Sequence, residues 1–203
     1  MKYAVIGSGK IGTALARVFA RNNIQVAIAN SRGPETLASL AEQLGPSVVP
    51  QSVTDASEAD IIFLAVPFPA HKDVAKIFKS WNGKIIVDTM NILDPSQKER
   101  EGLGGLLSSE AVAKAFSGAR VVKGFNHLPA ERLGTNPSIQ GQRQAVFLSS
   151  NDGDASAGVA ALAARLGFAP VELGKLDKGG TLLHVVGGKP GGLLFQNLVK
   201  LGR

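Results

Sequence analysis

Three glycines near the amino terminus have the spacing of a loop that binds phosphate groups. Gly7, Gly9 and Gly12 follow directly on the apolar residues 3–6, and small and apolar residues continue at helical spacing over residues 13–21. In such a strand–loop–helix unit the first glycine allows the tight turn, the second allows a pyrophosphate to approach the backbone, and the third allows close packing of helix on strand. The phosphate then lies at the helix amino terminus, where N–H groups and the dipole favour an anion. The predicted dinucleotide-binding residues of the loop are Gly7, Ser8, Gly9, Lys10, Ile11 and Gly12.

The next apolar segment covers residues 25–29. In proteins of this kind, the residues that follow it determine whether NAD or NADP binds. An NAD-binding protein of this kind has Asp or Glu there to hold the ribose 2′-hydroxyl. This chain has Asn30, Ser31 and Arg32 instead. No carboxylate repels a 2′-phosphate, Ser31 can donate a hydrogen bond and Arg32 can form charge-assisted ones. An ordinary polar turn before a helix that begins at Pro34 is the alternative, but the phosphate loop upstream favours NADP(H).

Apolar segments and helical patterns alternate along the whole chain. Residues 61–66 are apolar at every position, which indicates a strand covered on both faces of a parallel sheet. The pattern predicts an α/β fold of the Rossmann type with a doubly wound, mostly parallel sheet. The predicted strands are 3–6, 25–29, 47–50, 61–66, 84–88, 119–125, 145–149 and 170–173, and the predicted helices are 13–21, 35–44, 54–59, 70–80, 108–116 and 155–166.

We assign residues 1–150 to an NADP-binding Rossmann domain and residues 151–203 to a small C-terminal extension that packs on it, with a single domain overall as the alternative. In such sheets the ligand lies beyond the carboxyl ends of the strands, where the strand order reverses. This rule selects residues 66–69 and Asn91, and residues 126–127 complete the site. The amides of Asn91 and Asn126 are suited to a nicotinamide carboxamide or an acceptor carbonyl.

Four segments resemble the NADPH-dependent 8-hydroxy-5-deazaflavin reductase family and its relatives, which include the cytoplasmic reductase domains of the six-transmembrane ferric reductases. The segments are IGSGKIG at 6–12, NSRGPE at 30–35, AVPF at 65–68 and VVKGFNHLPA at 121–130. The resemblance implies a Rossmann domain with NADPH, and hydride transfer to a flavin-like ring, a reaction that needs positioning more than acid–base groups. It places the 2′-phosphate at Ser31 and Arg32, the nicotinamide near Ala65, Val66 and Pro67, and the acceptor ring near residues 126–129.

The resemblance has two departures at positions near the implied acceptor. The deazaflavin reductases have a histidine where this chain has Asn126, and a tryptophan where it has Phe68; here the histidine follows one place later, at His127. Asn126 and His127 are therefore the candidates for a catalytic role, and the identity of the acceptor stays open.

Other polar side chains have a structural interpretation that competes with a functional one. At a predicted helix start, His71 is expected to be exposed rather than bound to cofactor. Asp88 ends an apolar strand and could be a general base, but an Asp here more often caps the next turn. His184 lies in an apolar stretch and is expected to be packed. Because the histidines are too dispersed for a metal site, we predict no metal.

Composition excludes several function classes. The chain of 203 residues has no cysteine, so disulfides and thiol chemistry are excluded. The net charge is +6, but the basic residues are scattered and aromatic residues are few, which disfavours nucleic acid and suits a polyanionic cofactor. No apolar run approaches the roughly 20 residues of a membrane helix, and the amino terminus lacks the pattern of a signal peptide. We expect a cytoplasmic protein that does not bind membranes.

The tail combines glycines with an apolar segment. Glycines occur at 179–180, 187–188 and 191–192, and Leu193, Leu194, Phe195 and Leu198 follow. We expect the apolar segment to form the surface of a homodimer, and a flexible lid is the alternative role for the glycines.

The sequence thus predicts an NADPH-dependent oxidoreductase that exchanges hydride with a flavin, a deazaflavin or another small-molecule acceptor. The alternative is an NADP(H)-binding sensor or regulatory protein without turnover, since this fold permits both. A dehydrogenase of a carbon substrate is disfavoured, because residues 150–203 are too few for the helical substrate domain that such enzymes carry.

Overall fold

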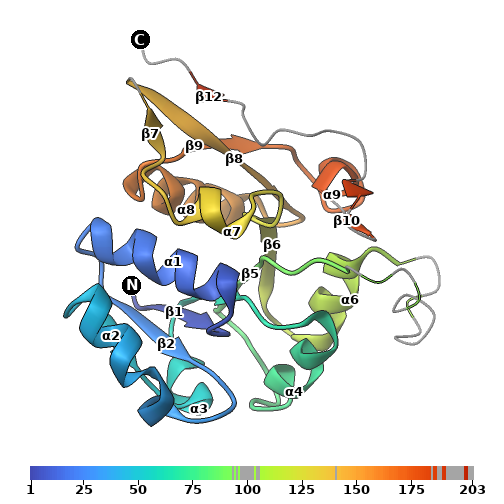
Figure 1. Cartoon of the computed structure of the whole chain (residues 1–203). Helices are drawn as coiled ribbons and strands as arrows, with labels where there is room; N and C mark the ends of the chain where they lie inside the picture. The colour runs from blue at the N-terminus through green and yellow to red at the C-terminus, as the bar shows by residue number, and fades with distance from the viewer. Residues whose placement is uncertain are drawn as a thin grey trace.

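The computed structural model describes residues 1–92, 94, 96, 103, 106–139, 141–183, 185–186, 189–190 and 199–200. Six parallel strands form most of one sheet (Figure 1), in the order β3-β2-β1-β4-β5-β6. They are β1 (Tyr3–Ile6), β2 (Val26–Ala29), β3 (Val48–Pro50), β4 (Ile61–Leu64), β5 (Ile85–Asp88) and β6 (Arg120–Gly124). The order reverses between β1 and β4, so the Rossmann-type α/β prediction is confirmed.

An antiparallel strand follows the parallel ones. The long strand β8 (Gln142–Ser150) runs antiparallel to β6 and pairs with it only through residues 148–150. Three further strands pair with β8: β9 (Ala169–Glu172) parallel to it, and β7 (Ser138–Ile139) and β12 (Val199–Lys200) antiparallel. A separate pair consists of β10 (Val185–Val186) and β11 (Lys189–Pro190). The main sheet therefore continues across residue 150.

Helices cover both faces of the sheet. Successive residues of a strand point to opposite faces, and in these parallel strands the residues on both faces are apolar. Val87 of β5 packs in the core with α1 (Lys10–Arg21) and α8 (Gly153–Arg165), and α2 (Ala38–Leu44) borders it. Ile86 packs in a second core on the opposite face, with α3 (Val53–Ala56), α4 (His71–Ala75) and α6 (Ser108–Ala115). Two short helices, α7 (Ala130–Leu133) and α9 (Gly179–Leu183), follow β6 and β9, and two 3₁₀ helices, η1 (Pro34–Leu37) and η2 (Phe68–Ala70), precede α2 and α4.

Several predicted elements are shorter than the sequence indicated, and two of them end at a carbonyl that a side chain binds. The helix predicted over residues 70–80 ends at Ala75, where the indole Nε1 of the buried Trp81 donates to the Ala75 carbonyl at 3.0 Å. This side-chain bond replaces the next intrahelical one. The strand predicted over residues 61–66 ends at Leu64, whose carbonyl accepts a hydrogen bond from the Thr89 hydroxyl. The sequence analysis did not predict α7, α9 or β7.

Candidate functional site

The glycine loop between β1 and α1 has three different environments at its three glycines. Gly7 has φ +113°, and a Cβ there would lie 2.2 Å from the Ala65 carbonyl oxygen. A Cβ at Gly12 would lie 1.7 Å from the Gly7 carbonyl oxygen. A Cβ at Gly9, in contrast, would meet nothing within 4 Å. The first and third glycines are thus required by close backbone packing, and the second leaves open space of the kind that a pyrophosphate needs.

The amino terminus of α1 is suited to an anion. Gly9 is the residue before the helix, and no side chain of the described residues caps it. The first turn contains no acidic residue. The Thr13 hydroxyl donates to the Ser8 carbonyl at 3.2 Å, which holds the loop against the helix. Since the first N–H groups of a helix have no intrahelical acceptor, this turn can donate to phosphate oxygens.

At the end of β2, a buried asparagine connects the glycine loop to the residues predicted to bind the 2′-phosphate. The Asn30 amide nitrogen donates to the hydroxyls of Ser8 and Thr36, at 3.0 and 3.1 Å. Its oxygen accepts from the Arg32 backbone N–H at 2.8 Å. Ser31 and Arg32 are exposed beside it. Asn30 therefore positions the turn by its side chain, and the two exposed residues are free to face a ligand.

After β4, the chain crosses close to the glycine loop. Ala65 and Val66 are half-buried and Pro67 is exposed. The backbone N–H of Ala65 donates to the Ile6 carbonyl at 2.8 Å, and Gly7 lies against the Ala65 carbonyl. The structure thus brings these predicted residues next to the loop.

The expectation that His71 is exposed is wrong. Its side chain is 1% exposed, its Nδ1 lies against the Phe68 carbonyl, and the two rings are 4.7 Å apart. The reason is its phase on α4, because residues at i, i+3 and i+4 of a helix share a face. Val74 and Ala75 are both buried, so His71 turns into the same core.

At the carboxyl ends of β5 and β6, two opposite charges lie buried side by side. The Lys123 ammonium is 3.2 Å from the Asp88 carboxylate, and the two residues are 1% and 0% exposed. Asp88 and Lys123 are partners in the strand register. Burial lowers the pKa of Lys123 below its ordinary value, and the attraction of Asp88 opposes that shift. The Asp88 carboxylate also accepts from the Met90 N–H at 2.9 Å, so its predicted role as a cap is confirmed.

The sequence analysis missed the role of Lys123. A lysine between apolar residues in a predicted internal strand, next to a strand that ends in aspartate, is the signal that could have found the pair.

Two asparagine amides join the loops that follow β5 and β6. The Asn91 amide nitrogen donates to the Asn126 carbonyl, and the Asn126 amide nitrogen donates to the Asn91 side-chain oxygen, both at 2.8 Å. Asn126 also donates to the Leu183 carbonyl of α9 at 2.7 Å. Because a backbone carbonyl only accepts, these bonds fix the orientation of both amides. The Asn126 side-chain oxygen is buried and has no hydrogen-bond partner among the described residues.

The imidazole of His127 faces the opposite neighbour, β8. Its Nε2 lies 3.5 Å from the Ala145 carbonyl, its ring is edge-on to Phe147 with centroids 5.1 Å apart, and its buried Nδ1 has no partner in the described part of the chain. Burial lowers the pKa of His127 to about 4, so the ring is neutral at pH 7. A neutral ring is an acceptor at one nitrogen, as is the Asn126 oxygen.

Phe125, the residue between β6 and this polar pair, has an unusual backbone. Its φ is +62°, in the left-handed region that bulky residues rarely adopt. Its buried ring lies between Phe63 and Phe168, at centroid distances of 5.4 and 5.9 Å. The aromatic packing thus offsets the backbone strain and turns the chain sharply at the end of β6.

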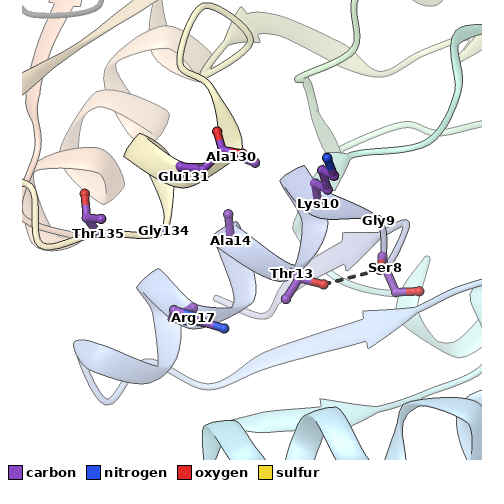
Figure 2. Close-up of a pocket in the computed structure, with 10 residues that line it drawn as sticks. All are labelled: Ser8, Gly9, Lys10, Thr13, Ala14, Arg17, Ala130, Glu131, Gly134 and Thr135. Atoms are coloured by element: carbon purple, nitrogen blue, oxygen red, sulfur yellow. Dashed lines mark hydrogen bonds between the residues drawn. The ribbon is translucent and has the colours of Figure 1, made fainter.

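A surface groove of about 550 Å³ begins at the glycine loop and continues between α1 and α7 (Figure 2). Lys10, Ala14 and Arg17 line it from α1, and Glu131 lines it from α7. The Arg21 guanidinium donates to the carbonyls of residues 134 and 135, which also line the groove, each at 2.6 Å. The sequence analysis did not predict this groove, because it did not predict α7.

The described residues contain no group of three or more His, Cys, Asp or Glu that could hold a metal ion. Within the same residues, no helix has the length and apolar character to cross a membrane. His184, residues 187–188 and the apolar segment at 191–198 lie outside the described residues.

Comparison with known proteins agrees with the geometry of the glycine loop. The model of a family described as NADP oxidoreductase, coenzyme F420-dependent, matches residues 2–92. Over these residues, the chain belongs to this deazaflavin-reductase-like family of NADP oxidoreductases. The match includes the glycine loop, the turn at residues 30–32 and Asn91, and ends before Lys123 and Asn126.

The chain is similar to a metalloreductase and to two bacterial proteins of known structure. Metalloreductase STEAP2 of Mus musculus is 32% identical over 177 residues, which are 85% of this chain and 33% of that protein. The chain thus spans about a third of the length of the curated relatives it matches. A hypothetical protein from Sinorhizobium meliloti is 40% identical, with a TM-score of 0.88 over 100% of this chain and 96% of that one. A protein from Arthrobacter sp. FB24, assigned as an F420-dependent NADP reductase, is 27% identical, with a TM-score of 0.67 over 87% and 86% of the two chains.

Proposed function

We propose that this protein is a reductase that oxidises NADPH and passes the hydride to a small planar acceptor, such as a flavin or a deazaflavin. The observation that carries the proposal is the open space at Gly9, between two glycines that backbone contacts require, at the uncapped amino terminus of α1. This arrangement fits a pyrophosphate. The family match over the same residues supports NADP as the dinucleotide.

Each region of the site has a distinct role in the proposal. The first turn of α1 binds the pyrophosphate, and Ser31 and Arg32 bind the 2′-phosphate, since both are exposed beside the buried Asn30. The nicotinamide half extends from Val66 towards Asn91 and residues 126–127. The free acceptor atoms on Asn126 and His127 are suited to N–H groups of a carboxamide or a ring lactam.

NADPH gives a hydride, that is two electrons and one hydrogen, to the acceptor and becomes NADP⁺. The reduced acceptor takes up a proton from solvent. Positioning is the main contribution of the protein, and no acid–base dyad is required. Beside Asn126, the His127 ring is neutral at pH 7, and the nearby Lys123 and Asp88 side chains are paired with each other. Such an environment suits a neutral ring better than a charged one.

The placement of the 2′-phosphate is tested by Arg32→Ala. We expect the Kd of NADPH to rise by about tenfold or more, since one charge-assisted contact is lost, and the Kd of NADH to stay within about twofold. Titration of protein with each nucleotide, followed by nicotinamide fluorescence, measures both. Arg143→Ala, an exposed arginine on β8, is the matched control and should change neither. Equal weakening of NADPH and NADH, or of neither, contradicts the placement.

The acceptor is tested by following absorbance at 340 nm while FMN, riboflavin, a deazaflavin or a ferric chelate is added to protein and NADPH. The ferric chelate is included because a curated relative is a metalloreductase. Oxidation by one class names the acceptor. Tight NADPH binding without oxidation by any of them would instead support a sensor role.

A further inference from the structure

The buried ion pair at the ends of β5 and β6 has no role in the dinucleotide contacts described above. Lys123 and Asp88 lie on the face of the sheet that packs against α4 and α6, among apolar side chains such as Val121 and Ile86. Removing two charges from water is expensive, and well-packed apolar residues often serve stability equally well. A buried pair at this place is therefore weak evidence for stability, and its contacts indicate another role.

The pair holds one residue of the β5–α6 loop from both sides. The Lys123 ammonium donates to the Met90 carbonyl, and the Met90 N–H donates to the Asp88 carboxylate at 2.9 Å. Because Met90 is itself 3% exposed, neither backbone group has water as an alternative partner. The backbone that leads into Asn91 is thus determined by two side chains.

The bonds continue from Met90 to the site. Asn91 exchanges two hydrogen bonds with Asn126, and Asn126 donates to the Leu183 carbonyl of α9. On the other side, the Thr89 hydroxyl donates to the Leu64 carbonyl at the end of β4. One continuous polar network therefore joins the ends of three neighbouring parallel strands and α9.

We infer that Lys123 and Asp88 are positioning residues for the nicotinamide half of the cofactor: they hold Met90, and through it the amides of Asn91 and Asn126. The inference rests on the proposed function. The adenosine half depends on the glycine loop and on residues 30–32, which share no hydrogen bond with this network in the described part of the chain. Disturbing the pair should therefore weaken the recognition of nicotinamide and leave that of the adenosine half intact.

The test compares two ligands on one variant, D88N/K123M. Lys123→Met alone leaves the buried Asp88 carboxylate without its oppositely charged partner and is expected to fold poorly. The double variant has no charge at either position. The amide oxygen at position 88 can still accept from the Met90 N–H, whereas the two bonds that the Lys123 ammonium donates, to residue 88 and to the Met90 carbonyl, are lost. The ligands are NADPH and adenosine 2′,5′-bisphosphate, which has the 2′-phosphate but no nicotinamide. Calorimetric titration gives both dissociation constants without any knowledge of the acceptor.

We expect the Kd of NADPH to rise by about fivefold or more, the effect of about one lost hydrogen bond, and that of adenosine 2′,5′-bisphosphate to stay within about twofold. Ser150→Ala is the matched control, because the buried Ser150 hydroxyl donates to Val121 near the other end of β6. It should lower the melting temperature and change neither constant.

Equal changes for the two ligands in the double variant, or unchanged binding of both, overturn the inference. It is overturned as well if the wild-type protein binds the two ligands equally, since the nicotinamide then makes no contribution. Failure of the wild-type protein to bind either ligand overturns the proposed function itself, so the two failures are distinguishable.

Discussion

The two ends of the proposed cofactor site are built differently. At β1 and β2, backbone atoms form the site: the glycine loop is shaped by contacts at Gly7 and Gly12, and one amide, Asn30, holds the adjoining turn. At β5 and β6, side chains form it, through the buried network around Lys123 and Asn126. Backbone recognition of phosphate suits any dinucleotide, whereas a side-chain network can be changed one residue at a time. The difference teaches that the two halves of the proposed cofactor site can be altered separately.

The largest effect is expected from Gly12→Ala, which attacks the backbone-built end. Its methyl group would overlap the Gly7 carbonyl, so α1 must move away from β1. We expect a loss of about 3 kcal/mol or more in the free energy of unfolding, together with loss of NADPH binding. Urea denaturation measures the stability. Gly158→Ala in α8, where the added Cβ meets only Ile85 at 3.9 Å, is the control and should not destabilise the protein.

Gly9→Val separates binding from folding at the same end. The new side chain has free space, so we expect the melting temperature to stay within a few degrees. The same side chain occupies the space proposed for the pyrophosphate, and we expect the Kd of both NADPH and NADH to rise by about a hundredfold or more. Gly153→Val, at the equally open start of α8, should leave both constants unchanged. Unchanged affinity in Gly9→Val would refute the phosphate-loop assignment.

Lowering the pH is expected to have a smaller effect on the free energy of unfolding, through His127 at the end of the site that side chains form. Burial lowers the pKa of His127 from 6.5 to about 4, so the unfolded chain binds a proton there more readily than the folded one. This contribution to stability is complete above pH 6.5 and is lost as the pH falls towards 4; between pH 7 and pH 5 the loss is about 2 kcal/mol. Denaturation at the two pH values measures it. His127→Gln should remove that part of the pH dependence, and an unchanged slope would show that the ring is not held neutral.

The end that the sequence predicted well is the one that depends on local chemistry. The glycine spacing, the apolar run at 61–66 and the polar turn at 30–32 each specify their structure within a few residues, so the parallel sheet and the loop could be predicted. His71 could not, because its burial depends on how α4 is turned against the sheet. The Lys123–Asp88 pair depends on which strands become neighbours, and α7 is too short to give a periodic pattern.

The left-handed backbone of Phe125 links the stability of the site to a segment that is distant in the sequence. Its ring is held on one side by Phe168, which lies between α8 and β9. When α8 and β9 open, the ring contact that offsets the strained backbone of Phe125 is lost, and the end of β6 is free to relax. We therefore expect the amide hydrogens of residues 126–128 to exchange with solvent at the rate at which α8 and β9 open. The loop proposed to face the substrate would then open together with α8 and β9, not with the strand that leads into it.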